Sequence, residues 1–114
     1  MASILLSEED PDVRRLLVIL LERLGHEVAS LDAGDEFELE ALDLVVLEPA
    51  GREGLSHVRM LRGERSDLPI LCVSVLPEEA RHLEIGPLTY LAKPFALDEL
   101  RDAVDRTLAL AFCS

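Results

Sequence analysis

Carboxylate, hydroxyl and ammonium side chains stand at the ends of separate short apolar runs in this chain. Glu8 and Glu9 follow one run, Glu48 and Ser74 close two others, and Lys93 follows a fourth. Clustered carboxylates raise one another's pKa or bind a hard cation such as Mg²⁺, which prefers oxygen ligands. A lysine opposite them would neutralise part of that charge or bind an anion held at the metal. A hydroxyl could hydrogen-bond the same anion, so together these residue types suit a site for a cation and an anion.

Taken singly, the same residues have simpler structural interpretations. An acidic run such as Glu8-Glu9-Asp10 is often a solvated cap at the positive end of a helix. Ser74 alone would be a strand hydroxyl bonded to nearby backbone, and Lys93 alone would be a surface lysine. The site interpretation is favoured because these side chains recur together at the ends of predicted strands.

The spacing of apolar residues predicts five strands that alternate with five helices. The predicted strands span residues 4–6, 27–31, 43–47, 69–75 and 88–92, and the predicted helices span residues 11–24, 35–42, 55–62, 77–83 and 97–111. This alternation is typical of an α/β domain with a doubly wound parallel sheet covered by helices on both faces. In such sheets, ligand-binding groups gather at the carboxyl ends of the strands. The elements are therefore expected to bring the candidate residues to one edge.

The first predicted helix carries clear start and stop signals. Asp10 can cap free backbone N–H groups, and Pro11 occupies the first helical position without losing a hydrogen bond. Gly25 supplies the stop. In the predicted helix 35–42, Phe37, Leu39 and Leu42 are expected to face inward.

Length and charge narrow the class of protein. The 114 residues are the size of one domain, 1–114, which is expected to be either a single-domain regulator or a fragment of a longer one. With 23 acidic and 11 basic residues the net charge is −12, which argues against a directly bound nucleic acid. The longest apolar run, 16–21, is too short to span a membrane, and the first residues do not resemble a secretory signal, so none is expected. A cytoplasmic location and no membrane partner are expected.

The cysteines and histidines predict no further chemistry. Cys72 and Cys113 form no CxxC pair, so neither a disulfide framework nor a zinc site is expected, and Cys72 is predicted to be a small core residue. His26, His57 and His82 show no metal-ligand spacing and are predicted to be ordinary surface or loop histidines.

Three segments resemble the receiver domains of bacterial two-component response regulators, and the resemblance covers essentially the whole chain. They are residues 4–15, residues 43–48 and, most specifically, Tyr90-Leu91-Ala92-Lys93-Pro94-Phe95. The resemblance implies a flavodoxin-like (βα)5 fold with strand order 2-1-3-4-5. It also implies a non-enzymatic role in phosphorelay signal transduction, in which an Asp after the third strand accepts a phosphoryl group from a histidine kinase.

The resemblance assigns a role to each candidate residue. Glu8 and Glu9 match the acidic pair that binds Mg²⁺ together with the acceptor, Glu48 matches the phosphoacceptor, Ser74 and Tyr90 match the switch hydroxyl and switch aromatic, Lys93 matches the conserved-type lysine, and Pro94 would follow a cis peptide bond. Considered without the resemblance, Tyr90 is equally well interpreted as a half-buried packing residue.

Departures from the family pattern bear on function. Glu48 stands where the family has Asp, and its extra methylene displaces the carboxylate where in-line attack tolerates little misplacement. Glu9 replaces an Asp that ligates the metal directly, and the loop 49–54 is short. Phosphorylation is therefore expected to be lost or very slow, and Mg²⁺ binding weak or lost, with no other cofactor. Glu48 would instead reach Lys93 and Ser74, imitate an aspartyl phosphate in part, and hold one signalling conformation.

Three functions follow from this pattern. The leading one is a receiver-like protein-interaction module with degenerate phosphorylation, whose partners are a histidine kinase, a downstream effector or an attached output domain, with a homodimer through strand 88–92 and helix 97–111. The second is a working receiver switched by Mg²⁺-dependent phosphorylation, for which Asp43 lies too far from the site to replace Glu48. The third is a small nucleotide or flavin binder, which would need a phosphate cradle where Glu8, Glu9 and Asp10 stand.

Overall fold

A computed structural model of the chain describes residues 2–49, 53–75 and 88–110. Its five strands form one parallel sheet in the order β2-β1-β3-β4-β5, so the predicted fold class and strand order are confirmed. The strands are β1 (Ser3–Ser7), β2 (Glu27–Ser30), β3 (Leu44–Leu47), β4 (Ile70–Ser74) and β5 (Leu88–Ala92). The helices are α1 (Pro11–Arg23), the 3-10 helix η1 (Leu39–Ala41), α2 (Gly54–Glu64) and α3 (Leu97–Leu110).

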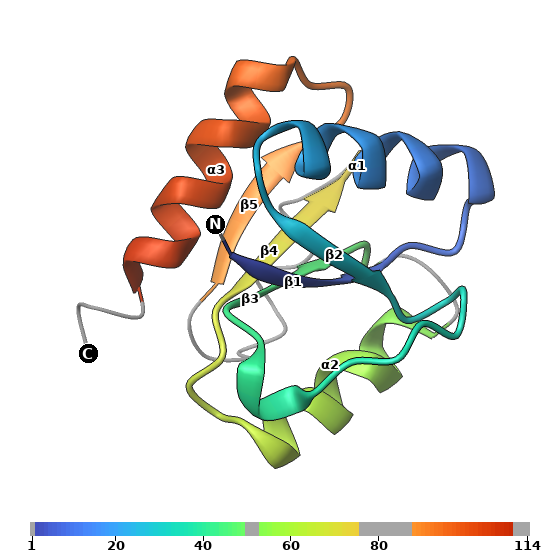
Figure 1. Ribbon diagram of the computed structural model, residues 1–114, viewed down its shortest axis with the longest axis vertical. Helices are drawn as coiled ribbons and strands as arrows, with labels where there is room; N and C mark the ends of the chain where they lie inside the picture. Colours follow the sequence, from blue (N-terminus) through green and yellow to red (C-terminus); the bar gives the residue numbers. More distant parts are fainter. Residues whose placement is uncertain (1, 50–52, 76–87, 111–114) are drawn as a thin grey trace.

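The sheet separates two hydrophobic layers because successive strand residues point to opposite faces. Helices α1 and α3 cover one face and α2 covers the other (Figure 1). Ile4 and Leu6 belong to the core under α1 and α3, whereas Leu5 belongs to the core over α2. Strand β3 is buried on both faces. Its four residues are all inaccessible to solvent, as expected for a strand covered by helices on both sides.

Helix α1 begins and ends where its residues predict. The Asp10 Oδ1 accepts hydrogen bonds from the backbone N–H groups of Asp12 and Val13 at 2.9 and 3.3 Å, and Pro11 is the first helical residue. Gly25 follows the helix with φ at +95°, a conformation that other residues adopt only at a cost. The predicted start of this helix is confirmed, and the helix ends at Arg23, one residue before the predicted end, with Leu24 as its C-cap.

The predicted helix 35–42 is wrong in extent, since only Leu39–Ala41 form a short 3-10 turn. Asp35 is held by Ser30 instead: its Oδ2 accepts from the Ser30 N–H at 2.8 Å, and its own N–H donates to the Ser30 carbonyl at 3.1 Å. Such side-chain bonds to the backbone compete with helix formation. The Arg65 guanidinium then binds the carbonyls of Leu39 and Leu42 at 3.0 and 2.7 Å. The predicted inward positions in this stretch are confirmed, since Leu42 is buried and two half-buried residues pack against the same core, Phe37 and Leu39.

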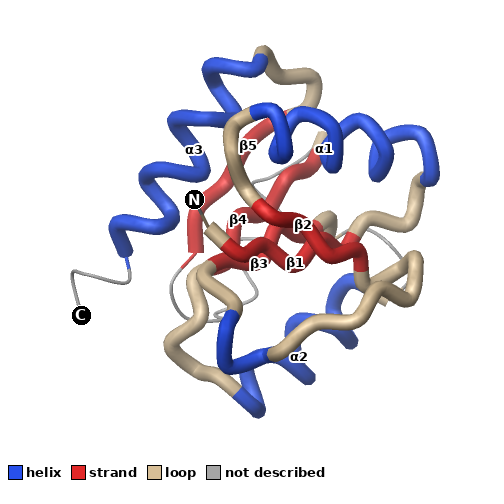
Figure 2. Tube along the Cα trace, viewed as in Figure 1, coloured by secondary structure: helices blue, strands red, loops and turns tan. Residues whose placement is uncertain are grey.

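Several other predictions can be compared with the structure. Cys72 is a fully buried, unpaired thiol, as predicted. The predicted helix 77–83, His82 and Cys113 lie outside the described residues. Among the described helices, none combines the length and the apolar character needed to cross a membrane. The tube in Figure 2 shows that the loops at one end of the sheet lead from the strands into α1 and α3, and this end carries the candidate site.

Candidate functional site at the carboxyl edge of the sheet

The strand register brings the predicted site residues to one edge. Ser7 pairs with Leu47, and Ser74 pairs with Ala92, so the strands β1, β3, β4 and β5 end at nearly the same level. Glu8, Glu48 and Lys93 each follow one of these strands directly. The convergence expected from the alternation of strands and helices is therefore present.

Lys93 joins the two carboxylates that flank it. Its Nζ donates to Glu8 Oε1 at 2.8 Å and to Glu48 Oε2 at 3.0 Å. The side chains are 17 % exposed for Lys93, 3 % for Glu8 and 14 % for Glu48, so the three charges are largely removed from water. One ammonium between two carboxylates leaves a net negative charge in a nearly closed site.

Burial and hydrogen bonding shift the pKa values of Glu8 and Lys93 for different reasons. Burial raises the pKa of the Glu8 carboxyl above its ordinary value of about 4.5, and the hydrogen bond and charge of Lys93 offset only part of that rise. Burial by itself would lower the pKa of Lys93, but hydrogen bonds to Glu8 and Glu48 outweigh it, so the pKa is raised. The lysine is thus held in its charged form by two acceptors, whereas Glu8 has a single cationic donor for a carboxylate that is almost fully buried.

Glu9 makes a different contact from Glu8. It is exposed, and its Oε1 accepts the backbone N–H of Glu53 at 2.7 Å, just before helix α2. Its carboxylate therefore satisfies a free N–H group at the start of that helix. The structure does not place Glu9 on Lys93, although both were predicted to share one site.

The donor set does not fit a divalent cation in this arrangement. Throughout residues 2–49, 53–75 and 88–110 there is no group of three or more His, Cys, Asp or Glu side chains placed to hold a metal ion. Lys93 already lies between Glu8 and Glu48, and Glu9 is engaged at the start of α2. Mg²⁺ requires near-ideal octahedral placement of oxygen ligands, which these contacts do not supply.

The remaining predicted site residues surround the triad. Ser74 is buried at the end of β4, and its carbonyl accepts the Lys93 N–H at 2.9 Å. Tyr90 is half-buried and packs against the core on the α2 face. The peptide bond between Lys93 and Pro94 is cis, as predicted.

A polar pair beside the triad was not anticipated. Ser7 Oγ lies 2.7 Å from His57 Nδ1, and His57 Nε2 lies 3.6 Å from Glu53 Oε2. The prediction that His57 is an ordinary surface or loop residue is wrong, because it lies on α2 with its side chain only 16 % exposed. A polar residue at the last, buried position of β1 was the one available signal.

Two further contacts delimit the site. The Glu8 N–H donates to Asp32 Oδ2 at 2.6 Å, which joins the turn after β2 to the end of β1. Asp43 Oδ2 accepts the N–H of Ser3, the first residue of β1, at 2.8 Å. Asp43 therefore lies at the opposite end of the sheet, and the expectation that it is too far from Glu48 to replace it is confirmed.

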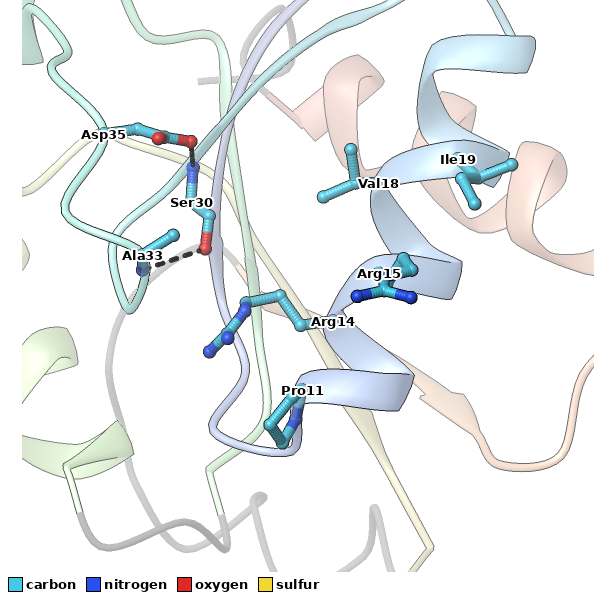
Figure 3. Close-up of a pocket in the computed structure, with 8 residues that line it drawn as sticks. All are labelled: Pro11, Arg14, Arg15, Val18, Ile19, Ser30, Ala33 and Asp35. Carbon is cyan, nitrogen blue, oxygen red and sulfur yellow. Dashed lines mark hydrogen bonds between the residues drawn. The ribbon is translucent and has the colours of Figure 1, made fainter.

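A separate groove of about 280 Å³ lies between α1 and the turn after β2. Figure 3 shows it lined on the helix side by Pro11, Arg14, Arg15, Val18 and Ile19, and on the other side by Ser30, Ala33 and Asp35. The hydrogen bonds that Asp35 and Ala33 make with Ser30 close the turn that forms this second wall. None of the residues of the triad lines this groove.

Comparison with known proteins agrees with this geometry. The model of the response regulator receiver domain family matches residues 4–105. A probable transcriptional regulatory protein from Picosynechococcus is 36 % identical over 87 % of this chain, and the match spans 46 % of that protein. The non-phosphorylated HemR receiver domain from Leptospira biflexa superimposes with a TM-score of 0.78 at 27 % identity, covering 96 % of this chain and 95 % of that one. A receiver domain protein from Clostridium thermocellum has the same fold, with a TM-score of 0.79 at 18 % identity, covering 96 % and 95 %.

A five-stranded parallel sheet with acidic residues and a lysine at its carboxyl edge defines a receiver-type α/β domain. The chain belongs to the family of response regulator receiver domains of two-component systems. The match spans about half the length of two curated relatives, 46 % of one and 44 % of the other. It spans 24 % of the length of another relative, the regulator NtrC from Azospirillum brasilense.

Proposed function

We propose that this receiver acts as a protein-interaction module in two-component signalling without being phosphorylated. The observation that carries the proposal is the position of the Lys93 ammonium, at 2.8 Å from Glu8 and 3.0 Å from Glu48. In a phosphorylated receiver, a lysine at this position would contact the phosphoryl group. Here the carboxylate of Glu48 itself supplies the negative charge that Lys93 binds.

The chemistry of Glu48 supports the same conclusion. Phosphoryl transfer depends on close positioning of the attacking oxygen and on electrostatic stabilisation of the transferred group. The additional methylene of a glutamate displaces that oxygen, and Lys93 already occupies one oxygen of the carboxylate. Glu8 already binds Lys93, and Glu9 binds the N–H of Glu53, so this arrangement does not assemble the cation site that would neutralise an incoming phosphoryl group. The module is then held in one signalling conformation.

The partners follow from the class of protein. The matched relatives carry names of transcriptional regulators, one of them a DNA-binding transcriptional regulator NtrC from Azospirillum brasilense. We expect this receiver to act on an output domain of the same chain or on a separate signalling protein, with any contact to DNA made by the output domain. The net charge of −12 agrees with a receiver that does not itself bind nucleic acid. A homodimer would use the face formed by β5 and α3.

An amide-resolved NMR titration tests the proposal. The wild-type protein is titrated with Mg²⁺ and then with beryllium fluoride, an analogue of a phosphoryl group, and the variant Glu48→Asp is titrated in parallel. We expect no saturable shifts of the amides of Glu8, Glu48 and Lys93 in the wild type. Saturable binding in Glu48→Asp alone would assign the defect to that side chain, whereas no binding in either would assign it also to Glu9 and the short loop.

The same titration can also contradict the proposal. If the wild type binds both ligands and the amide of Tyr90 shifts with them, the chain is a working phosphoacceptor switch and the proposal is wrong. Incubation with a small-molecule phosphodonor, followed by intact-mass analysis, gives an independent check. A mass increase of one phosphoryl group that Glu48→Gln abolishes would also contradict it.

A further inference from the structure

The groove between α1 and the turn after β2 carries opposite charges on its two walls (Figure 3). Its volume of about 280 Å³ is at the lower end of the range for small-molecule sites. Arg14 and Arg15 line it from the helix, and Asp35 lines it from the turn. Among the described residues, no ion pair joins Asp35 to either arginine. The groove therefore separates two cations from one anion.

The charged groups on both walls are incompletely hydrogen-bonded within the described part of the chain. Arg14 is half-buried, and its one hydrogen bond to a described residue runs from Nη1 to the Glu8 carbonyl at a long 3.4 Å. Arg15 is exposed and makes no such bond. Asp35 accepts the Ser30 N–H with Oδ2, which leaves Oδ1 without a donor among the same residues. Because a guanidinium carries five N–H donors, both walls can bind further polar groups.

Apolar side chains complete the helix wall of the groove. Val18 and Ile19 each lie four residues after one of the arginines, Arg14 and Arg15, and so share a side of the helix with them. Ile19 is 48 % exposed, and covering such apolar surface is favourable. The groove thus combines positions for a carboxylate and for an ammonium group with an apolar surface beside them.

We propose that this groove binds a small zwitterion with an apolar side chain, of the chemical class of the apolar α-amino acids. Arg14 and Arg15 bind the carboxylate, because the planar fork of a guanidinium matches its two oxygens. Asp35 accepts the ammonium group, and Val18 and Ile19 cover the side chain. A ligand with an anionic group alone would be repelled by Asp35, so charge complementarity favours a molecule that carries both signs.

Both walls of the groove also hold the backbone of Glu8. Arg14 Nη1 donates to the Glu8 carbonyl at 3.4 Å, and Asp32 Oδ2, in the turn after β2, accepts the Glu8 N–H at 2.6 Å. The Glu8 side chain in turn binds Lys93. A ligand that draws Arg14 toward its carboxylate weakens one of these contacts and so acts on the charged triad. This role as an input rests on the proposed function, whereas the binding itself does not.

A titration followed by amide NMR tests this inference with three probes that share one carbon skeleton. Leucine carries both charges, isocaproate lacks the ammonium group, and isoamylamine lacks the carboxylate. In the wild type, leucine is expected to shift the amides of Arg15, Val18 and Ala33 saturably, together with the amide of Glu8. The other two probes are expected to bind about tenfold more weakly, because each loses a charge-assisted hydrogen bond.

Three variants test the two walls separately. Asp35→Asn keeps an oxygen that can accept the Ser30 N–H, and we expect it to lose the preference for leucine over isocaproate. Arg14→Gln is expected to bind leucine about tenfold more weakly and to lose the shift of the Glu8 amide. The matched control is Arg23→Gln, which removes a positive charge from the exposed last turn of α1 outside the groove. It is expected to bind leucine as the wild type does.

Three results of this titration would overturn the inference. One is the absence of saturable shifts at millimolar leucine, and another is equal binding of all three probes, which would report an unspecific apolar contact. Shifts in the groove without a shift at Glu8 would overturn the link to the triad. Binding of beryllium fluoride in the absence of these probes would instead contradict the proposed function, so the two failures are distinguishable.

Discussion

Lys93 Nζ lies 3.0 Å from Glu48 Oε2, and this contact bridges the ends of β3 and β5 across the end of β4, which lies between them in the sheet. The ammonium takes up the charge of the residue that would otherwise accept a phosphoryl group. The same ammonium lies 2.8 Å from Glu8, so the triad holds one excess negative charge in a nearly closed site, and loss of the lysine would leave two carboxylates without a cation.

Lys93→Met is expected to destabilise the protein strongly. The change leaves Glu8 and Glu48 as neighbouring carboxylates with no cation, and removal of one partner from a largely buried ion pair costs about 3 kcal/mol. The measurement is urea unfolding at neutral pH. The double variant Lys93→Met/Glu8→Gln should recover part of the loss, because only one carboxylate then remains. A single variant as stable as the wild type would show that the triad contributes nothing.

Glu8 and Lys93 give the stability a defined dependence on pH. The raised pKa of Glu8 means that the folded state binds its proton more tightly than the unfolded state does. The stability linked to this group is therefore present below about pH 4.5, and it is lost as the pH rises through the folded pKa. Unfolding free energies measured from acid to neutral pH should show the wild type losing stability relative to Glu8→Gln over this window. Parallel curves would contradict the assignment.

A second pH window belongs to Lys93. Its pKa is raised above 10.5, so the stability it contributes is fully present below that pH and is lost as the pH rises through the folded pKa. Glu48→Gln removes one of its two acceptors and is expected to shrink this alkaline loss. Thermal unfolding between neutral and strongly alkaline pH measures it, with Glu64→Gln at the exposed end of α2 as the control that should follow the wild type.

Two glycines of α2 offer a matched pair of substitutions. At Gly54 a Cβ atom would meet the Glu48 carbonyl at 2.5 Å, so Gly54→Ala must displace the helix or the end of β3, at a cost of about 1–3 kcal/mol. At Gly63 the same atom would meet nothing within 4 Å, so Gly63→Ala is expected to stabilise the helix by about 0.5–1 kcal/mol. Urea unfolding of both variants tests the close approach. Equal effects would show that α2 does not pack on Glu48 in this way.

Cys72 is expected to be chemically inert in the folded protein. Burial, together with the nearby charge of Glu48, raises the pKa of its thiol to about 12, so almost no thiolate forms at neutral pH. In the background of Cys113→Ser, reaction with an aromatic disulfide reagent should occur only as fast as the protein unfolds. Rapid labelling without denaturant would show that the core around β4 opens locally.

The amino-acid sequence was sufficient to predict most of the strands and helices and their order in the sheet. Strands and helices alternate because their hydrophobic periods differ, and the start of α1 follows from Asp10 and Pro11, whose effects are local. The stretch 35–42 was predicted wrongly because its helical spacing was overridden by contacts with Ser30 and Arg65, which lie outside it. Hydrogen bonds between a side chain and the backbone of another segment leave no periodic pattern in the sequence, so the spacing of apolar residues could not reveal them.

The residue types at the ends of the strands could be predicted from the sequence alone, because position along the chain decides where each apolar run stops and a polar residue follows. Their partners could not be predicted in this way. Lys93 is 85 residues from Glu8 along the chain, and His57 is 50 residues from Ser7, so these pairs depend on strand order and on the distance between α2 and the sheet. Only tertiary packing decided that Glu9 satisfies the start of α2 while Glu8 binds the lysine, because neighbouring residues leave a strand end in different directions.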